Sequence, residues 1–83
     1  MRPASYHLTR ETLREWIAAR LDIPTTEVRC EANLFAHGMD SLEVMTIVNR
    51  LRRQGIVVTY QAFAAEPTLD KWWQVITEAA DHH

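Results

Sequence analysis

Apolar residues recur at intervals of three and four along the first quarter of the chain, which is the spacing of one helix face. Thr9 precedes this stripe and has a side chain suited to an N-cap, while Asp22 and Pro24 follow it. We therefore expect an amphipathic helix that begins after Thr9 and is ended by Asp22 and Pro24. Its apolar stripe consists of Leu13, Trp16, Ile17 and Leu21.

A second apolar stripe predicts a helix over residues 41–54. Asp40 stands at the N-cap position, and Gly55 stands where many helices have a left-handed residue just beyond their end. The positions between them follow the helical period completely. The stripe consists of Val44, Ile47, Val48 and Leu51.

The last third of the chain predicts a short helix over Tyr60–Ala65 and a longer one after Thr68. Residues 56–59 favour a strand by composition, but no second strand is available to pair with them, so we expect an extended connector. The longer helix carries two adjacent tryptophans, whose side chains point about 100° apart. We expect one of them in the core and the other at its edge. The apolar residues of this helix are Leu69, Trp72, Trp73, Ile76 and Ala79.

The connection over residues 22–39 is long for a small domain, and such loops are commonly functional. We expect Leu34 and Phe35 to turn inward and fix this loop to the core. Gly38 then allows the chain to turn just before Ser41. The sequence thus predicts that the residues before Ser41 are held in one place.

The 83 residues suffice for one small domain, which we place at residues 8–80. We expect residues 1–7 to be a flexible leader and residues 81–83 a disordered tail. The predicted fold class is all-α, a bundle of four helices with a long first loop and a short third helix.

Charge and composition exclude several classes of function. The net charge of −2 argues against a general nucleic-acid binder. Cys30 is the single cysteine, so no internal disulfide can form, and we expect it to be a small packing residue of a cytoplasmic protein. No apolar run is long enough to cross a membrane. We expect no metal site and do not assign one to His82 and His83.

Ser41 is the residue whose setting points to chemistry. A nucleophile elbow would need Gly-x-Ser-x-Gly after a strand, with a base and an oxyanion hole. Here Gly38 lies three residues before the serine, no glycine follows two residues after it, and nothing would orient His37 as a base. Ser41 instead begins a helix, where free N–H groups favour a bound anion. We interpret it as an attachment point and expect no catalytic residue.

Residues 33–42, Asn-Leu-Phe-Ala-His-Gly-Met-Asp-Ser-Leu, resemble the attachment motif of phosphopantetheine-dependent carrier proteins. The order and length of the expected helices over residues 8–80 are similar as well. This resemblance implies a four-helix bundle of the acyl carrier protein type. It implies that a phosphopantetheinyl transferase moves 4′-phosphopantetheine from coenzyme A to Ser41, and that Asp40 assists the transferase besides capping the helix. The chain would then be a substrate of partner enzymes and not an enzyme.

Residues 67–73, Pro-Thr-Leu-Asp-Lys-Trp-Trp, are similar to a segment of aryl carrier proteins from siderophore and related nonribosomal peptide pathways. That resemblance implies an aromatic acyl group carried as a thioester. An aryl-adenylating ligase would load it, and a condensation domain or acyltransferase would remove it. We expect a monomer. A peptidyl or acyl carrier protein with a non-aryl cargo remains the alternative of the same fold.

Partner enzymes need an accessible apolar surface around Ser41, and methionine suits a surface that meets several partners. By comparison with similar carriers, we expect five residues to contact partners, whereas we place Phe63 in the core. The five are Met39, Leu42, Met45, Tyr60 and Ala64.

Arg50, Arg52 and Arg53 near the end of the second helix support an alternative of a different class, a small helical interaction or DNA-binding module. The negative net charge weighs against it. Cations also suit the negative end of a helix dipole, which explains the cluster without a ligand. The resemblance associates fatty-acid carriers with a strongly acidic second helix, and this chain lacks one.

Overall fold

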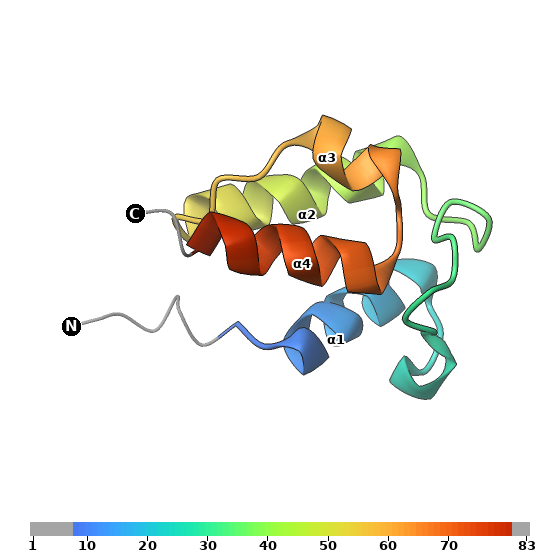
Figure 1. The fold of residues 1–83 in the computed structure, drawn as a ribbon. Coiled ribbons are helices and arrows are strands. Elements are labelled where there is room, and N and C mark those ends of the chain that lie inside the picture. Colours follow the sequence, from blue (N-terminus) through green and yellow to red (C-terminus); the bar gives the residue numbers. More distant parts are fainter. Residues whose placement is uncertain (1–7, 81–83) are drawn as a thin grey trace.

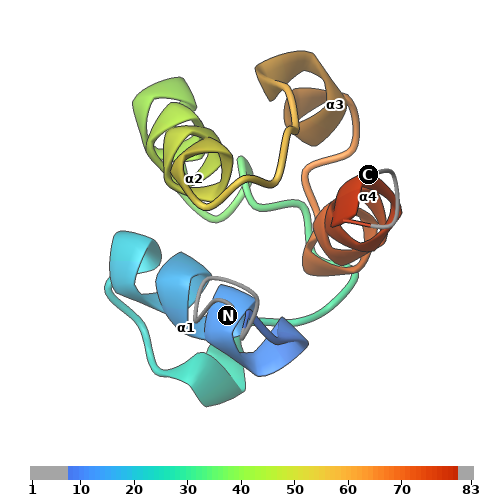
Figure 2. The same ribbon diagram turned by 90° about the vertical axis from the view of Figure 1, so that its left-hand side faces the viewer.

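The computed structural model describes residues 8–80 (Figure 1). Within these residues the chain forms four α-helices, a single 3₁₀ turn and no strand, and the helices surround one core (Figure 2). The predicted all-α fold is therefore confirmed. The leader and tail expected at residues 1–7 and 81–83 lie outside the described residues. The elements are α1 (Arg10–Leu21), η2 (Thr25–Glu27), α2 (Ser41–Arg53), α3 (Tyr60–Ala65) and α4 (Leu69–Ala80).

The ends of α1 confirm the predicted boundary signals. Thr9 is the N-cap, and its hydroxyl oxygen accepts a hydrogen bond from the backbone N–H of Thr12 at 3.0 Å. Beyond Leu21, Asp22 takes a left-handed conformation with φ 58° and ψ 48°, and its N–H donates to the carbonyl of Ala18. The left-handed residue stops the helix, because it turns the chain away from the helix axis.

The predicted apolar stripes form the core. On α1, two of the four residues are fully buried, and Trp16 and Leu21 are half-buried. All four residues of the α2 stripe are at most 2% exposed. The fully buried residues of the two stripes are Leu13, Ile17, Val44, Ile47, Val48 and Leu51.

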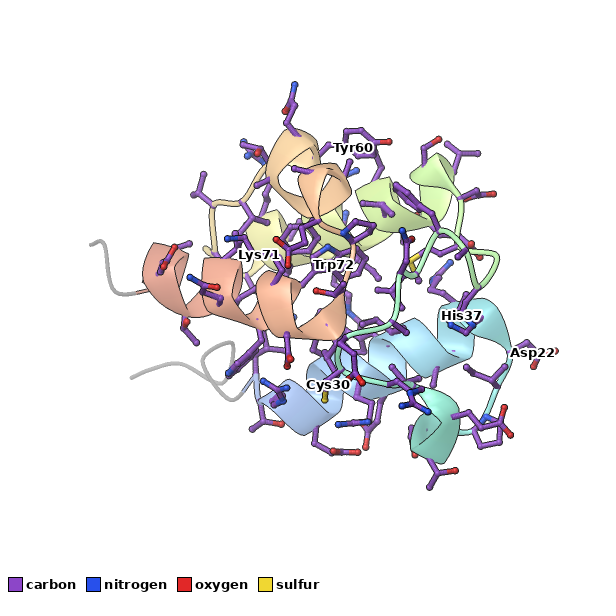
Figure 3. All side chains as sticks on the ribbon, turned by 45° about the vertical axis from the view of Figure 1, so that its right-hand side comes forward. Asp22, Cys30, His37, Tyr60, Lys71 and Trp72 are labelled. Carbon is purple, nitrogen blue, oxygen red and sulfur yellow. The ribbon has the colours of Figure 1, made fainter. Side chains whose placement is uncertain are left out.

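The two tryptophans of α4 separate as expected. Thr68 caps this helix by accepting from the N–H of Lys71 at 3.1 Å. Trp72 is fully buried among the helices (Figure 3), and its Nε1 donates to the carbonyl of Phe63 at 2.8 Å. The rings of Phe63 and Trp72 stack with their centroids 4.6 Å apart. Trp73 is half-buried at the edge of the core, whereas Trp72 joins α4 to α3 through its contacts with Phe63.

Residues 56–59 form an extended connector, as we predicted because no second strand is available to pair with them. Ile56 and Val58 are buried, whereas Val57 between them is 67% exposed. The alternation follows from extended backbone, in which successive side chains point to opposite sides.

Backbone hydrogen bonds fix the long loop to the start of α4. The N–H of Leu34 donates to the carbonyl of Pro67 at 2.8 Å, and the N–H of Asp70 donates to the carbonyl of Cys30 at 3.0 Å. Leu34 itself is 1% exposed, which confirms its predicted inward orientation. The loop that leads to α2 is thus held at two points by a distant part of the chain.

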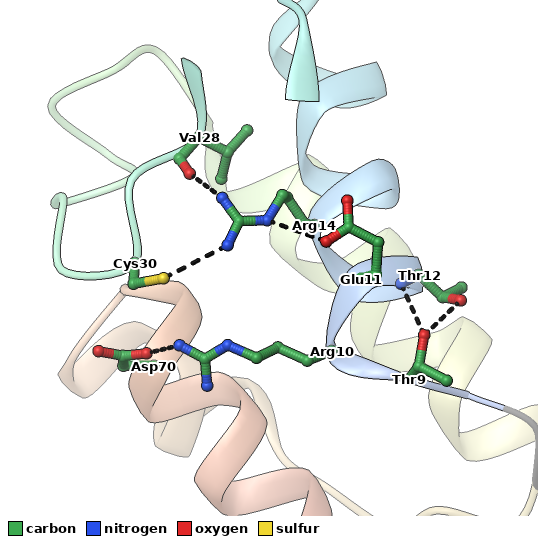
Figure 4. Close-up of polar contacts among 8 residues, drawn as sticks. All are labelled: Thr9, Arg10, Glu11, Thr12, Arg14, Val28, Cys30 and Asp70. Carbon is green, nitrogen blue, oxygen red and sulfur yellow. Dashed lines mark hydrogen bonds and ion pairs between the residues drawn. The ribbon is translucent and has the colours of Figure 1, made fainter. Parts of the chain in front are cut away.

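Two arginines of α1 make further polar contacts here, Arg14 with the loop and Arg10 with the start of α4 (Figure 4). Arg14 donates to the carbonyl of Val28 and to Sγ of Cys30, the latter at 3.4 Å. Arg10 pairs with the carboxylate of Asp70. Hydrogen bonding to Cys30 and Asp70 raises the pKa of the Arg10 guanidinium. Cys30 packs at the edge of the core as expected and also serves as a hydrogen-bond acceptor.

Candidate functional site

Ser41 is the first residue of α2, and it is exposed. Asp40 caps the helix, because its carboxylate accepts from the N–H of Glu43 at 2.9 Å. The carboxylate of Glu43 in turn accepts from the N–H of Asp40 at 3.1 Å, which completes a capping box. Both acidic groups beside the serine are therefore engaged in holding the helix start.

The start of α2 suits a phosphate ester on Ser41. The capping box occupies the N–H of Glu43, and the N–H of Val44 donates to the carbonyl of Asp40 at 3.1 Å. Among the hydrogen bonds of the described residues, none uses the N–H of Ser41 or of Leu42. Those two groups and the helix dipole favour an anion at this point, by about 0.3–1 kcal/mol at an exposed site.

A tight turn delivers the chain to this helix start. The carbonyl of Leu34 accepts from the N–H groups of both His37 and Met39 at 3.1 Å, and the N–H of Gly38 donates to the carbonyl of Phe35 at 3.1 Å. Gly38 has φ 102°, a conformation that side chains disfavour, although a Cβ there would meet no atom within 4 Å. The glycine is thus needed for its backbone conformation and not for space.

The turn exchanges the expected roles of Phe35 and Met39. Phe35, which we expected to point inward, is 37% exposed, whereas Met39, which we expected to contact partners, is 3% exposed and belongs to the core cluster. The physical reason is the pair of hydrogen bonds that the carbonyl of Leu34 accepts from His37 and Met39, which reverses the chain and turns Met39 into the core cluster that also holds Leu34. Met39 is therefore not part of the accessible surface around Ser41.

The other four residues expected to meet partners are accessible to different degrees. Leu42 is 76% exposed, while Met45, Tyr60 and Ala64 are half-buried. They lie on α2 and α3, which pack against each other. Phe63 is fully buried, as predicted.

Within the described residues, Ser41 has neither a hydrogen-bonded catalytic base nor a cluster of metal ligands beside it. His37 is exposed in the loop (Figure 3), and no hydrogen bond within residues 8–80 joins it to Ser41 or to a carboxylate. In the same residues, no cluster of three or more His, Cys, Asp or Glu side chains could hold a metal ion. None of the described helices has the length and apolar character needed to cross a bilayer.

Two of the three arginines near the end of α2 have partners within the fold. The guanidinium of Arg50 lies 4.1 Å from the ring centroid of Trp16, and Arg52 donates to the carbonyl of Val58 at 3.1 Å. These contacts give Arg50 and Arg52 a structural role that needs no ligand. The case for a nucleic-acid-binding module is weaker as a result.

The comparison with family models shows to which protein family the chain belongs. The model described as the phosphopantetheine attachment site matches residues 11–76. The chain belongs to this family. It is a carrier and not a catalyst, and the family bears 4′-phosphopantetheine as a covalent group.

Several curated proteins contain a segment similar to this carrier chain. Phenyloxazoline synthase MbtB of Mycolicibacterium paratuberculosis is 37% identical over 67 residues, which are 81% of the chain and 6% of that protein. Isochorismatase of Bacillus subtilis is 33% identical, over 83% of the chain and 22% of that protein. The acyl carrier protein ScoB of Streptomyces coeruleorubidus is 33% identical, over 84% of the chain and 82% of its own length. The chain thus spans only a small part of the first two relatives. No solved structure gives a significant match.

Two elements of this carrier's site were absent from the sequence prediction. Glu43 completes the capping box, and its position three residues after Asp40 was a usable signal. Pro67 accepts the bond from Leu34 that anchors the loop, and no local pattern could have paired these distant residues.

Proposed function

We propose that the chain is an aryl carrier protein that receives 4′-phosphopantetheine on Ser41, with residues 8–80 as its carrier unit. The observation that carries this proposal is the exposed Ser41 hydroxyl at the first position of α2, in a chain that belongs to the phosphopantetheine attachment family. In the attachment step, the serine oxygen forms a bond to the β-phosphorus of coenzyme A. The pyrophosphate bond breaks, 3′,5′-adenosine diphosphate leaves, and the hydroxyl proton passes to a base of the transferase.

The residues around Ser41 have separate tasks in this proposal. Asp40 and Glu43 hold the first turn, so that the hydroxyl stays at one place on the surface. The free N–H groups of Ser41 and Leu42 stabilise the phosphodiester that results. Asp40 also presents a carboxylate beside the serine, which we assign to recognition by the transferase. The thiol of the attached arm carries an acyl group as a thioester.

The names of the proteins that contain segments similar to this chain support an aromatic cargo. One is named phenyloxazoline synthase, another pseudomonine synthase and a third isochorismatase. Together with the Pro-Thr-Leu-Asp-Lys-Trp-Trp segment at residues 67–73, they favour an aromatic acid such as a hydroxybenzoate. We assign an aryl-adenylating ligase as the loading enzyme and a condensation domain or acyltransferase as the acceptor. The setting we propose is a monomer in the cytoplasm.

A non-aryl acyl cargo is the second candidate. The observation that favours it is the similarity to an acyl carrier protein over 82% of that protein's length. Loading of the phosphopantetheinylated chain by adenylating ligases for aromatic and aliphatic acids, followed by mass spectrometry, separates the two. Preferred loading with an aliphatic acid would remove the aryl assignment and leave the carrier function in place.

The attachment itself is tested by incubating the chain with coenzyme A and a broad-specificity phosphopantetheinyl transferase. We expect the mass to rise by one phosphopantetheine and the modified peptide to contain Ser41. Ser41→Ala should abolish the addition while its circular dichroism spectrum and unfolding midpoint stay close to those of the parent chain. A parent chain that gains no mass, or gains it at another residue, would overturn the proposed function.

A further inference from the structure

We propose that the exposed side chains around the last turn of α2, remote from Ser41, form a docking surface for an acidic patch of the ligase that loads the carrier. This inference rests on the proposed function. The partner chemistry that fits the surface is a group of carboxylates beside an apolar side chain. We call this surface the basic end of α2, and it consists of Arg50, Arg52, Arg53 and Val57.

The positive charge of the basic end is not balanced by acidic residues of the same segment. Residues 44–65 contain three arginines and no aspartate or glutamate, although the whole chain has a net charge of −2. The three ion pairs within residues 8–80 all lie in α1, the long loop and the first turn of α4. Arg10, Arg14 and Arg29 therefore have carboxylate partners, whereas in the described part of the chain no arginine of α2 has one.

The contacts of Arg50 and Arg52 position their guanidinium groups without neutralising them. Arg50 lies over the ring of Trp16, and Arg52 donates to the carbonyl of Val58. Neither partner carries a net charge, so both guanidinium groups keep theirs, and part of the side-chain entropy that binding would cost is already lost. The side chain of Arg53 is exposed and makes no hydrogen bond or ion pair within residues 8–80. Such groups suit carboxylates, which guanidinium binds through paired hydrogen bonds.

An exposed apolar side chain stands beside these cations. Val57 is 67% exposed, and it directly precedes Val58, whose carbonyl holds Arg52. The helix dipole accounts for basic residues in a last turn, but it gives no reason for an exposed valine next to them. Arginine together with apolar side chains is the composition that protein interfaces favour.

The loading ligase is the partner for which the protein surface matters most. It meets the carrier before any acyl group is attached, and the phosphopantetheine arm is common to the whole family. Selection at this step must therefore depend on the protein itself. Ser41 and Arg53 are the first and last residues of α2, so the helix separates them by about 18 Å. A contact patch of about 800 Å² is roughly 30 Å across, so a ligase that holds the arm also reaches the basic end.

The test measures loading of the phosphopantetheinylated chain by an aryl-adenylating ligase at increasing carrier concentration. We expect Arg53→Glu to raise KM about 3- to 10-fold with kcat within about twofold, because it replaces an attraction by a repulsion without touching the reacting thiol. The matched control is Arg20→Glu, which makes the same change of charge in the last turn of α1 and should leave KM within about twofold of the parent value. Added salt should raise the parent KM more steeply than that of Arg53→Glu.

Further variants and a second probe separate docking from other roles of Arg53. Arg53→Lys keeps the charge and should keep KM close to the parent value, and urea unfolding reports the stability of each variant. Equal KM values for Arg53→Glu and Arg20→Glu would overturn the inference and leave the proposed function intact. A chain that accepts phosphopantetheine but is loaded by no aryl-adenylating ligase would overturn the aryl assignment and the inference with it. Binding of a DNA duplex by the parent chain, but not by Arg53→Glu, would assign the surface to a nucleic acid and would also overturn the inference.

Discussion

The two ends of α2 are closed in different ways, the first by polar side chains and the second by backbone hydrogen bonds and apolar packing. At the start, two side chains, Asp40 and Glu43, close the helix through the capping box. At the end, the backbone closes it: the N–H of Ile56 donates to the carbonyl of Leu51 at 3.0 Å, while Gly55 takes φ 88°. Leu51 and Ile56 are at most 3% exposed, so this Schellman-type end is sealed by apolar packing.

The difference separates two tasks within one helix. The end at Leu51 is sealed by apolar packing, which contributes stability and needs no accessible group. The open end must leave Ser41 and two N–H groups free, so it is held by polar side chains that lie beside the serine and do not cover it. Substitutions at the two ends should therefore change different properties of the protein.

The largest expected effect comes from making the same substitution at both ends. Leu51→Ala removes a fully buried side chain and should lower the free energy of unfolding by about 2–5 kcal/mol. Leu42→Ala removes a side chain that is 76% exposed and should change it by less than about 0.5 kcal/mol. Urea unfolding followed by circular dichroism measures both. Similar losses for the two variants would contradict the division of tasks.

A smaller effect is expected from the cap. Asp40→Ala removes the acceptor for the N–H of Glu43 and should lower the free energy of unfolding by about 1 kcal/mol. Asp40→Asn retains a capping oxygen, so its stability should stay close to that of the parent chain. If the carboxylate also serves the transferase, both variants should be modified more slowly. Parent-like modification of Asp40→Asn would limit Asp40 to capping.

The smallest expected effect is a gain in stability from a substitution at the end of α1. This helix end resembles that of α2 but has no glycine in the left-handed position. Asp22 occupies the left-handed position there, with φ 58°. Asp22→Gly should relieve the cost of holding a side-chain-bearing residue in the left-handed conformation, and it removes a negative charge from the negative end of the helix dipole. The free energy of unfolding should rise by about 0.5–1 kcal/mol, which a higher midpoint of thermal unfolding would report. Asp22→Ala keeps a Cβ and should bring no comparable gain. A lower midpoint for the glycine variant would contradict this expectation.

Sequence reasoning located the helices well because their signals are local. Thr9, Asp40 and Thr68 cap helices as expected, and α2 ends at Arg53, one residue before the predicted position. The apolar stripes identified the buried faces, since one helix face must turn toward the core. The position of Ser41 at the start of α2 followed from the same local signals.

The long loop was less predictable, because no repeating pattern tells which side chain of an irregular turn points inward. Leu34 was placed correctly, while Phe35 and Met39 were exchanged. The turn η2 within the loop was not expected either. The bond from Leu34 to Pro67 depends on residues that meet only in the folded chain.

Those bonds from the loop to the start of α4 have a consequence for protein synthesis. A nascent chain that has emerged only as far as Ala65 contains Ser41 and its helix but lacks Pro67 and Asp70, which anchor the loop. Contacts between distant residues form late, because the intervening chain must first be ordered. We therefore expect that a ribosome-bound chain is a poor substrate until its last helix has emerged, so that translation itself delays the modification.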